Sequence, residues 1–185
     1  ILEVMGRYAG WIALHAAIAG GAEVCLIPEI PYDLKKVIEV IDQRVDNGKG
    51  FAIIVIAEGA KPLEGAMSYS ENDTPGAMKI RLGGAGLRLS QDLKDAGSCV
   101  EIRETILGHL QRGGRPNSFD RILASMFGVK AFELVLEEKW GHMVAYRHPN
   151  IIAVPISDAI KEYNLVDVNS DLVKTARGLG ISLGD

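Results

Sequence analysis

Short apolar runs alternate along this chain with longer segments whose apolar residues follow helical spacing. The run over residues 51–57 is the clearest of the apolar runs. It is continuous and rich in Ile and Val, which is typical of a strand covered on both faces. The spacing predicts strands over 1–4, 23–27 and 99–107, one or two short strands within 142–156, and helices over 8–18, 34–45, 78–96 and 118–138. This alternation favours an α/β fold with a mainly parallel sheet and right-handed crossovers.

Cap and turn residues predict where several elements begin and end. Gly21 follows the first helix and suits a left-handed C-terminal residue, whereas Asp33 suits the N-cap of the second helix. Residues 60–77 are rich in Pro, Gly, Asn and Asp, which predicts a loop. Ser157 and Ser170 are predicted to cap two short helices near the end of the chain.

The charge balance and the cysteines limit the function classes. The net charge of the 185 residues is −4, so broad attraction to nucleic acid or to membrane surfaces is not expected and any anion site must be local. Cys25 and Cys99 lie in apolar stretches without metal-ligand spacing, which favours a reduced cytoplasmic protein without a metal site over a disulfide. No apolar run approaches the roughly 18 residues of a membrane span. The chain begins inside a strand pattern, which we interpret as a boundary within a longer protein.

Three predicted strands end in residues that suit a phosphorylated sugar. In an open parallel sheet, ligands bind at the carboxyl ends of the strands. Arginine offers a planar fork of donors to phosphate, a glutamate accepts hydrogen bonds from sugar hydroxyls, and glycines allow a ligand close to the backbone. If these strands are neighbours, they form one sugar-phosphate site from Met5, Gly6, Arg7, Glu58, Gly59, His109 and Arg112.

Plainer interpretations of the same residues remain open. Arg7, like the His109 and Arg112 pair, could be a solvated charge near a turn, and Glu58 could cap a neighbouring helix. Arg103 is predicted inside the last strand of the sheet, on the same face as His109. If Arg103 is buried there, it requires a carboxylate, a phosphate or a subunit boundary beside it.

The order and spacing of several segments resemble the carboxyl-terminal half of the 6-phosphofructokinase family: Met5–Gly10, Ala16–Glu23, Ile56–Gly59, Leu107–Gly114, Pro116 and Asp120–Ser125. The resemblance implies a three-layer α/β/α fold. It also implies phosphoryl transfer from ATP or pyrophosphate, with Mg²⁺, to the 1-hydroxyl of fructose 6-phosphate. Such an enzyme would be a glycolytic, cytoplasmic homo-oligomer, either a dimer or a tetramer.

The resemblance also implies a role for each site residue. His109 and Arg112 would hold the 6-phosphate, and Glu58 would bind the sugar hydroxyls. Arg7 would be catalytic, close to the transferred group, where a fixed cation stabilises a phosphoryl transition state. The implied substrate-binding set is Met5, Gly6, Arg7, Glu58, Arg103, His109 and Arg112, with Arg103 reaching the site of a neighbouring subunit.

The resemblance divides the chain into three parts. Residues 1–112 would form the sugar-phosphate-binding domain, residues 113–165 would pack on a nucleotide domain, and residues 166–185 would return to the first part with a helix. The family's glycine-rich donor motif and its catalytic Asp motif do not occur in these residues. We therefore expect this chain alone to be inactive, with Mg²⁺ and the phosphoryl donor bound mainly by the other half.

The family's effector site is degenerate in this sequence. Gly21, Glu23 and Lys49 match effector-binding positions, but the basic residues usual nearby are replaced at Asn47, Gly50 and Phe51. This favours a weakly regulated enzyme of the pyrophosphate-using or non-allosteric branch. The alternative is a stand-alone sugar-phosphate sensor without catalysis. A dinucleotide-binding domain is disfavoured, because no Gly-x-Gly-x-x-Gly turn follows the first strand.

Overall fold

The computed structural model of the chain describes residues 1–64, 69–71, 80–82, 84–98 and 100–185. The chain divides into unit 1, which contains Ile1–Arg112 and Asn164–Asp185, and unit 2, which contains Gly113–Tyr163. Within the described ranges, no helix has the length and apolar character needed to cross a membrane.

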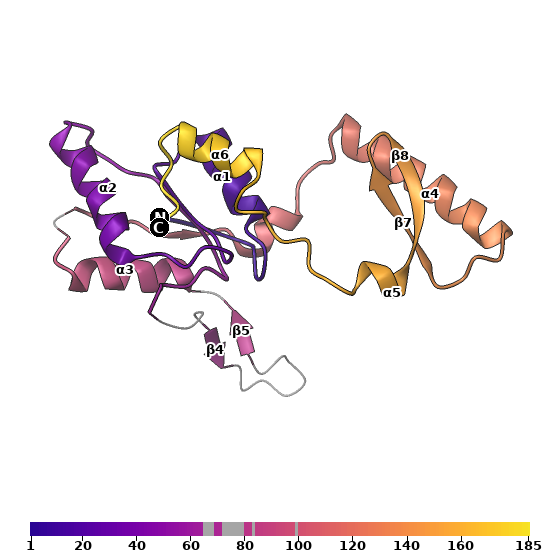
Figure 1. Cartoon of the computed structure of the whole chain (residues 1–185), viewed down its shortest axis with the longest axis horizontal. Helices are drawn as coiled ribbons and strands as arrows, with labels where there is room; N and C mark the ends of the chain where they lie inside the picture. Colours follow the sequence, from indigo (N-terminus) through magenta and orange to yellow (C-terminus); the bar gives the residue numbers. More distant parts are fainter. Residues whose placement is uncertain (65–68, 72–79, 83, 99) are drawn as a thin grey trace. The chain divides into compact units, whose positions relative to one another are not determined.

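A parallel sheet lies at the centre of unit 1 (Figure 1). Its strands among the described residues have the order β2-β3-β1-β6, and their bounds are Leu2–Val4 for β1, Val24–Leu26 for β2, Ile54–Ala57 for β3 and Thr105–Ile106 for β6. Leu2 of β1 pairs with Val55 on one side and with Thr105 on the other, so β1 lies between β3 and β6. The predicted parallel α/β fold is confirmed.

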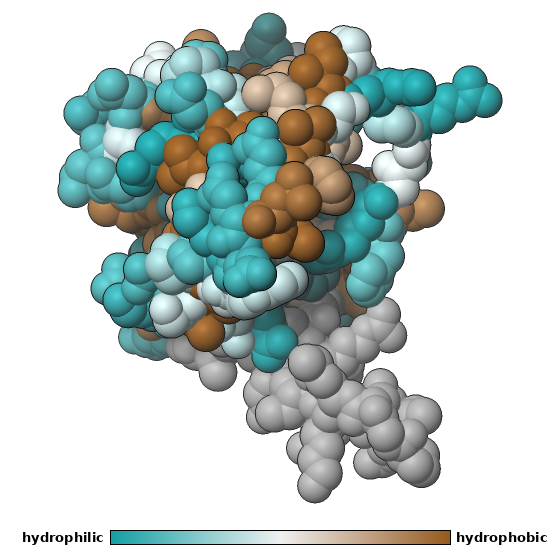
Figure 2. All heavy atoms as spheres, turned by 90° about the vertical axis from the view of Figure 1, so that its right-hand side faces the viewer, coloured by the Kyte–Doolittle hydropathy of each residue, from teal (hydrophilic) through white to brown (hydrophobic). Residues whose placement is uncertain are grey.

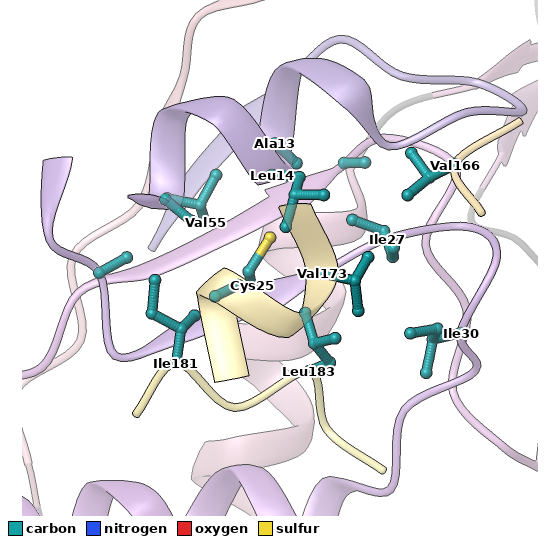
Figure 3. Packing of buried hydrophobic residues seen from close by; sticks show 14 of the residues in the cluster. Ala13, Leu14, Cys25, Ile27, Ile30, Val55, Val166, Val173, Ile181 and Leu183 are labelled. Carbon is teal, nitrogen blue, oxygen red and sulfur yellow. The ribbon is translucent and has the colours of Figure 1, made fainter. Parts of the chain in front are cut away.

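Helices cover both faces of this sheet, which makes three layers. Helices α1 and α6 pack on one face, and their bounds are Trp11–Gly20 and Asp171–Gly178. On the other face lie α2 and α3, with bounds Leu34–Asp46 and Ala85–Asp95. Alternate side chains of one strand enter opposite cores, as when Cys25 joins the α1 and α6 layer (Figure 3) while Leu26 joins the other.

The predicted helix ends are largely confirmed. Asp33 accepts a hydrogen bond from the Lys35 amide at 2.9 Å, and Ser170 accepts one from the Val173 amide at 3.4 Å. Gly21 adopts a left-handed φ of 68° after α1, which a side chain would disfavour. Ser157 is not a cap, because helix α5 (Ile156–Ala159) already contains it and Pro155 precedes the helix.

The stretch from residue 60 to residue 107 departs from the sequence prediction. Residues 80–82 form strand β5 (Ile80–Leu82), which pairs antiparallel with β4 (Tyr69–Glu71), so the predictions of helix and loop were wrong there. Helix α3 begins only after Gly84, whose φ of 84° is unsuited to a helix interior. Residues 65–68 and 72–79, together with Gly83 and Cys99, lie outside the described residues. The predicted strand over 99–107 shortens to β6, which among the described strands pairs with β1 alone.

Unit 2 consists of a helix packed on a hairpin. Helix α4 (Ser118–Leu136) begins with a capping box in which Asn117 and Asp120 bond each other's backbone amides. The one or two short strands predicted over 142–156 are two, β7 (His142–Arg147) and β8 (Asn150–Pro155), and they pair antiparallel. Apolar surface is visible between polar side chains in Figure 2. Large exposed apolar side chains of unit 2 include Ile122, Val129, Phe132, Leu136 and Trp140.

Glu29 joins two distant parts of unit 1. Its carboxylate accepts hydrogen bonds from the Gly10 amide at 3.0 Å, at the start of α1, and from the Val166 amide at 2.8 Å. Glu29→Gln places an amide NH₂ among these donors and removes a charge that favours the helix N-terminus, so we expect the free energy of unfolding to fall by about 1–2 kcal/mol. Glu39→Gln on the exposed face of α2 is the control and should change it by less than about 0.5 kcal/mol. Equal denaturant midpoints for the two variants would contradict this role.

Burial makes the Cys25 thiol a weak acid. The side chain is fully buried, and burial, followed by the nearby Glu29 charge, raises its pKa from 9.0 to about 12. Above pH 9 the unfolded chain loses this proton while the native chain keeps it, so stability decreases as the pH rises. From pH 8 to pH 10 this one group should lower the free energy of unfolding by about 1.4 kcal/mol. Denaturant unfolding of the parent protein and Cys25→Ala at both pH values should show that difference, and parallel pH dependences would refute it.

Candidate functional site

The sheet order brings three predicted site segments to one edge of unit 1. Residues 5–7 follow β1, Glu58 follows β3, and the 3₁₀ helix η1 (Gly108–Arg112) follows β6. Because β1 lies between β3 and β6 and all three are parallel, these segments leave the sheet at its carboxyl edge. The carboxylate of Glu58 and the cationic turn of η1 therefore flank the β1 turn, at the position where open parallel sheets bind ligands.

Hydrogen bonds hold the end of β3 against the end of β1. The Glu58 amide donates to the Val4 carbonyl at 2.9 Å, and the Gly59 amide donates to the Gly6 carbonyl at 3.0 Å. The Glu58 side chain also turns toward this segment, because its Oε1 accepts a hydrogen bond from the Gly6 amide at 3.4 Å. The carboxylate is thus placed beside the β1 turn, half-buried, with oxygen lone pairs left for a ligand.

The two glycines of this corner serve the protein's own backbone. A Cβ atom on Gly59 would lie 2.0 Å from the Arg7 carbonyl oxygen, so the expectation that Gly59 leaves room for a ligand was wrong. Gly6 has a φ of 151°, and a Cβ atom there would lie 2.9 Å from the Ala9 carbonyl oxygen. The absence of both side chains allows the ends of β1 and β3 to pack directly on each other.

Arg7 contributes a buried side-chain donor to this corner. Its Nε is buried and has no hydrogen-bond partner among the residues that the structure describes. The guanidinium carbon lies 5.1 Å from the centre of the Tyr8 ring, which orients the planar group. Because an unsatisfied buried donor is costly, an anionic oxygen that reached this Nε would be favoured.

His109 and Arg112 lie in the 3₁₀ helix η1 rather than directly at a strand end, which corrects the sequence prediction. Side chains three residues apart eclipse each other in a 3₁₀ helix, so the imidazole and the guanidinium project from one side of η1. Both residues are exposed and open to a ligand. Gly108 begins this turn with a left-handed φ of 51°.

Sequence reasoning missed two residues that tie neighbouring elements to β1 or to the residue after it. Glu3 of β1 is only 3% exposed, and its carboxylate accepts hydrogen bonds from the Gly84 and Gly86 amides at the start of α3, at 3.1 and 2.8 Å. A carboxylate inside an apolar strand was a usable signal for this role, because a buried charge requires donors. Gln111 of η1 accepts a hydrogen bond from the Met5 amide at 3.3 Å, and no sequence signal marked it.

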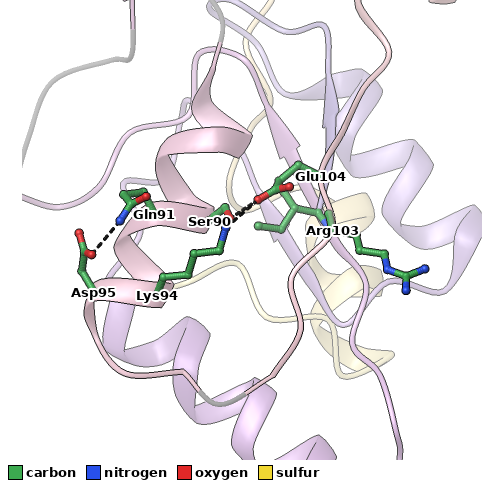
Figure 4. Close-up of polar contacts among 7 residues, drawn as sticks. Ser90, Gln91, Lys94, Asp95, Arg103 and Glu104 are labelled. Atoms are coloured by element: carbon green, nitrogen blue, oxygen red, sulfur yellow. Dashed lines mark hydrogen bonds and ion pairs between the residues drawn. The ribbon is translucent and has the colours of Figure 1, made fainter.

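Arg103 lies at the amino ends of the parallel strands, opposite to the carboxyl ends where the other site segments lie. It precedes β6, its carbonyl accepts a hydrogen bond from the Ile1 amino group at 2.7 Å, and its side chain is 85% exposed, so its predicted position inside a strand was wrong. Figure 4 shows the Arg103 side chain pointing away from Glu104, which bonds Ser90 and Lys94 of α3. These bonds, that from Ser90 first, lower the pKa of Glu104. Its Nε pairs with the exposed Glu101 carboxylate at 2.9 Å, so the Arg103 side chain lies at the surface beside a carboxylate and before β6.

A separate cavity of about 410 Å³ lies between α1, α2 and the end of α6. Gly21 and Glu23, two predicted effector residues, line it, whereas Lys49 is exposed and outside the lining. Glu23 is already engaged, because its Oε1 lies 2.5 Å from the Arg44 guanidinium and its Oε2 accepts a hydrogen bond from the Ile53 amide at 2.6 Å. Among the described residues, no cluster of three or more His, Cys, Asp or Glu could hold a metal ion.

Comparisons with known proteins match between about three quarters and all of this chain. A family model described as phosphofructokinase matches residues 1–135. ATP-dependent 6-phosphofructokinase 2 of Clostridium perfringens is 46% identical over 187 residues, which covers 100% of this chain and 50% of the relative. Pyrophosphate–fructose 6-phosphate 1-phosphotransferase of Amycolatopsis methanolica is 42% identical and is matched over 90% of this chain and 48% of its own length. The chain thus spans about half the length of the curated relatives it matches.

Solved structures share the fold. Pyrophosphate-dependent phosphofructokinase from Marinobacter aquaeolei superposes with a TM-score of 0.72 at 25% identity, over 98% of this chain and 43% of that one. Phosphofructokinase from Saccharomyces cerevisiae gives a TM-score of 0.69 at 29% identity, over 100% of this chain and 23% of that one. The similarity therefore extends from the sequence to the arrangement of the elements.

Proposed function

Because this chain belongs to the phosphofructokinase family, we propose that it is the acceptor-binding half of a 6-phosphofructokinase. The whole protein would transfer a phosphoryl group from ATP or pyrophosphate to the 1-hydroxyl of fructose 6-phosphate, as a glycolytic enzyme of the cytoplasm. One observation carries the proposal most directly: Glu58 and η1 flank the Met5–Arg7 turn at the carboxyl edge of the sheet. That edge combines cations for a phosphate with a carboxylate for hydroxyls.

Each residue at this edge has a role in the proposed site. The side chains of His109 and Arg112, on one side of η1, would hold the 6-phosphate. Glu58 would accept hydrogen bonds from the sugar hydroxyls. Arg7 would bring its guanidinium to the transferred group, where a preorganised cation stabilises the charge that develops during transfer.

The remaining components come from outside this chain. Mg²⁺ and the phosphoryl donor would be bound mainly by the other half of the protein, where the ion would neutralise charge on the donor phosphates. Arg103 would complete the site of a neighbouring subunit in a homo-oligomer. Its exposed position at the amino end of β6 supports this role. Residues 113–165 would pack on the nucleotide-binding part.

The direct test is an assay of the product of the complete reading frame. It should phosphorylate fructose 6-phosphate with ATP or with pyrophosphate as donor, and comparison of the two donors identifies the branch. The 185-residue chain alone should show no turnover. A complete protein that binds fructose 6-phosphate but transfers no phosphoryl group from either donor would instead indicate the sensor function. The relatives are named as phosphofructokinase and phosphotransferase, which does not favour a sensor.

We expect the proposed enzyme to respond weakly to nucleotide effectors. Arg44 already neutralises Glu23 in the cavity, and the basic residues usual in the family's effector site are absent at residues 47, 50 and 51. Addition of GDP at saturating donor should therefore change the KM for fructose 6-phosphate by less than about twofold. A large, saturable decrease in that KM would contradict this expectation.

A further inference from the structure

We propose that Gln111 is a positioning residue that locks the phosphate-binding side chains of η1 onto the end of β1. This inference rests on the proposed function, because it concerns the same sugar-phosphate site. It assigns to the Gln111 amide the task of setting where His109 and Arg112 stand relative to Arg7 and Glu58.

The segment that carries His109 and Arg112 is weakly anchored by other means. η1 has five residues and none of them is buried. A 3₁₀ helix has poor hydrogen-bond geometry and is stable only in short pieces, so tertiary contacts must set its orientation. The preceding strand β6 pairs through two residues, and Leu110 of η1 is 80% exposed. Leu107 gives an apolar anchor before the turn, and its amide donates to the Glu3 carbonyl at 3.1 Å, but it lies outside η1.

The Gln111 side-chain amide anchors η1 through both its oxygen and its nitrogen. Its Oε1 accepts a hydrogen bond from the Met5 amide at 3.3 Å, directly beside the Gly6–Glu58 contact. Its Nε2 donates to the Gly108 carbonyl at 3.2 Å, within the same turn. One side chain therefore closes η1 on itself and ties it to the residue after β1.

This arrangement connects the two sides of the proposed site through one short path. Met5 and Gly6 are adjacent, and their amides point to Gln111 on the η1 side and to Glu58 on the β3 side. Loss of the Gln111 link would leave His109 and Arg112 chemically intact but free to shift. Because phosphate recognition by a guanidinium requires correct geometry, a displacement of about 1 Å weakens binding strongly.

The test uses the complete protein and two variants. Gln111→Met is close in shape and loses both hydrogen bonds, and Gln111→Asn keeps the amide but is too short to bridge both groups. Each should raise the KM for fructose 6-phosphate on the order of 10-fold, with an unchanged KM for the phosphoryl donor. Gln91→Met is the matched control, because it makes the same chemical change on the exposed face of α3, where Gln91 bonds Asp95. It should leave both KM values unchanged.

A second measurement separates positioning from general stability. If Gln111 acts through His109 and Arg112, then Gln111→Met added to a variant that carries both His109→Ala and Arg112→Ala should raise the KM for fructose 6-phosphate by less than about twofold further. An equal fold-change in both backgrounds would overturn the proposal. A Gln111→Met variant with a lower Tm and a lower kcat, but without a selective change in the KM for fructose 6-phosphate, would also overturn it.

The outcomes distinguish this inference from the proposed function. If the complete protein does not phosphorylate fructose 6-phosphate, or if Arg112→Ala leaves its KM unchanged, the proposed function or its site is wrong and the inference fails with it. If Arg112→Ala raises this KM while both Gln111 variants stay within twofold of the parent, only the positioning role of Gln111 is wrong.

Discussion

Arg112→Ala in the complete protein should raise the KM for fructose 6-phosphate by about 10- to 100-fold, with a smaller effect on kcat. A hydrogen bond to a charged group contributes about 1.5–3 kcal/mol, which corresponds to that range. Arg112 is exposed at the end of η1, so removal of its side chain leaves no buried partner unpaired and should not disturb the fold. Steady-state kinetics with fructose 6-phosphate as the varied substrate measures the effect.

Two comparisons sharpen this result. Arg112→Lys keeps the charge but loses the planar fork, so its KM should lie between those of the parent and Arg112→Ala. Arg115→Ala removes an equally exposed arginine three residues further on and should leave the KM within about twofold of the parent. If Arg115→Ala and Arg112→Ala raise the KM equally, the effect is one of general charge and the 6-phosphate contact is not at Arg112.

Gly59→Ala should destabilise the protein by about 3 kcal/mol and lower kcat/KM by about 100-fold. The added Cβ would stand 2.0 Å from the Arg7 carbonyl oxygen and 2.8 Å from the Gly6 carbonyl oxygen, and both obstacles are backbone atoms. To relieve the overlap, the ends of β1 and β3 must separate, which shifts Arg7 and Glu58 together. Thermal unfolding and steady-state kinetics on the same preparation report the two effects.

Gly20→Ala is the matched control for this substitution. Gly20 is the last residue of α1, and a Cβ atom there would have no neighbour within 4 Å. Alanine also has the higher helix propensity, so Gly20→Ala should be neutral or stabilising by up to about 1 kcal/mol. A Gly59→Ala variant as stable and as active as Gly20→Ala would contradict this prediction, because it would show that the ends of β1 and β3 can separate without loss of stability or activity.

Local patterns were sufficient to predict most elements of this chain. The apolar run before Glu58 predicted β3, and the side chains of Asp33 and Ser170 predicted two helix starts, because strand burial and N-cap bonds depend on neighbours in sequence. Residues 80–82 were predicted wrongly as helix, since their pairing with residues 69–71 is a contact that apolar spacing cannot express. The strand predicted around Arg103 was too long for a similar reason, because pairing at a sheet edge depends on the partner strand.

The sequence was sufficient to identify the alternating α/β order, the cationic and acidic residues after three strands, and the resemblance to a family. These are properties of residue type and spacing. Only the tertiary structure decided that β1 lies between β3 and β6 and that His109 and Arg112 share one side of a 3₁₀ turn. It also decided that Arg103 is exposed before β6 and pairs with Glu101. Strand order depends on pairing between segments that are distant in sequence. Gly59 meets the Arg7 backbone across about 50 positions. The hydrogen bond between Gln111 and Met5 spans 106 positions. No local pattern encodes such contacts, because their energies exist only when the sheet has formed.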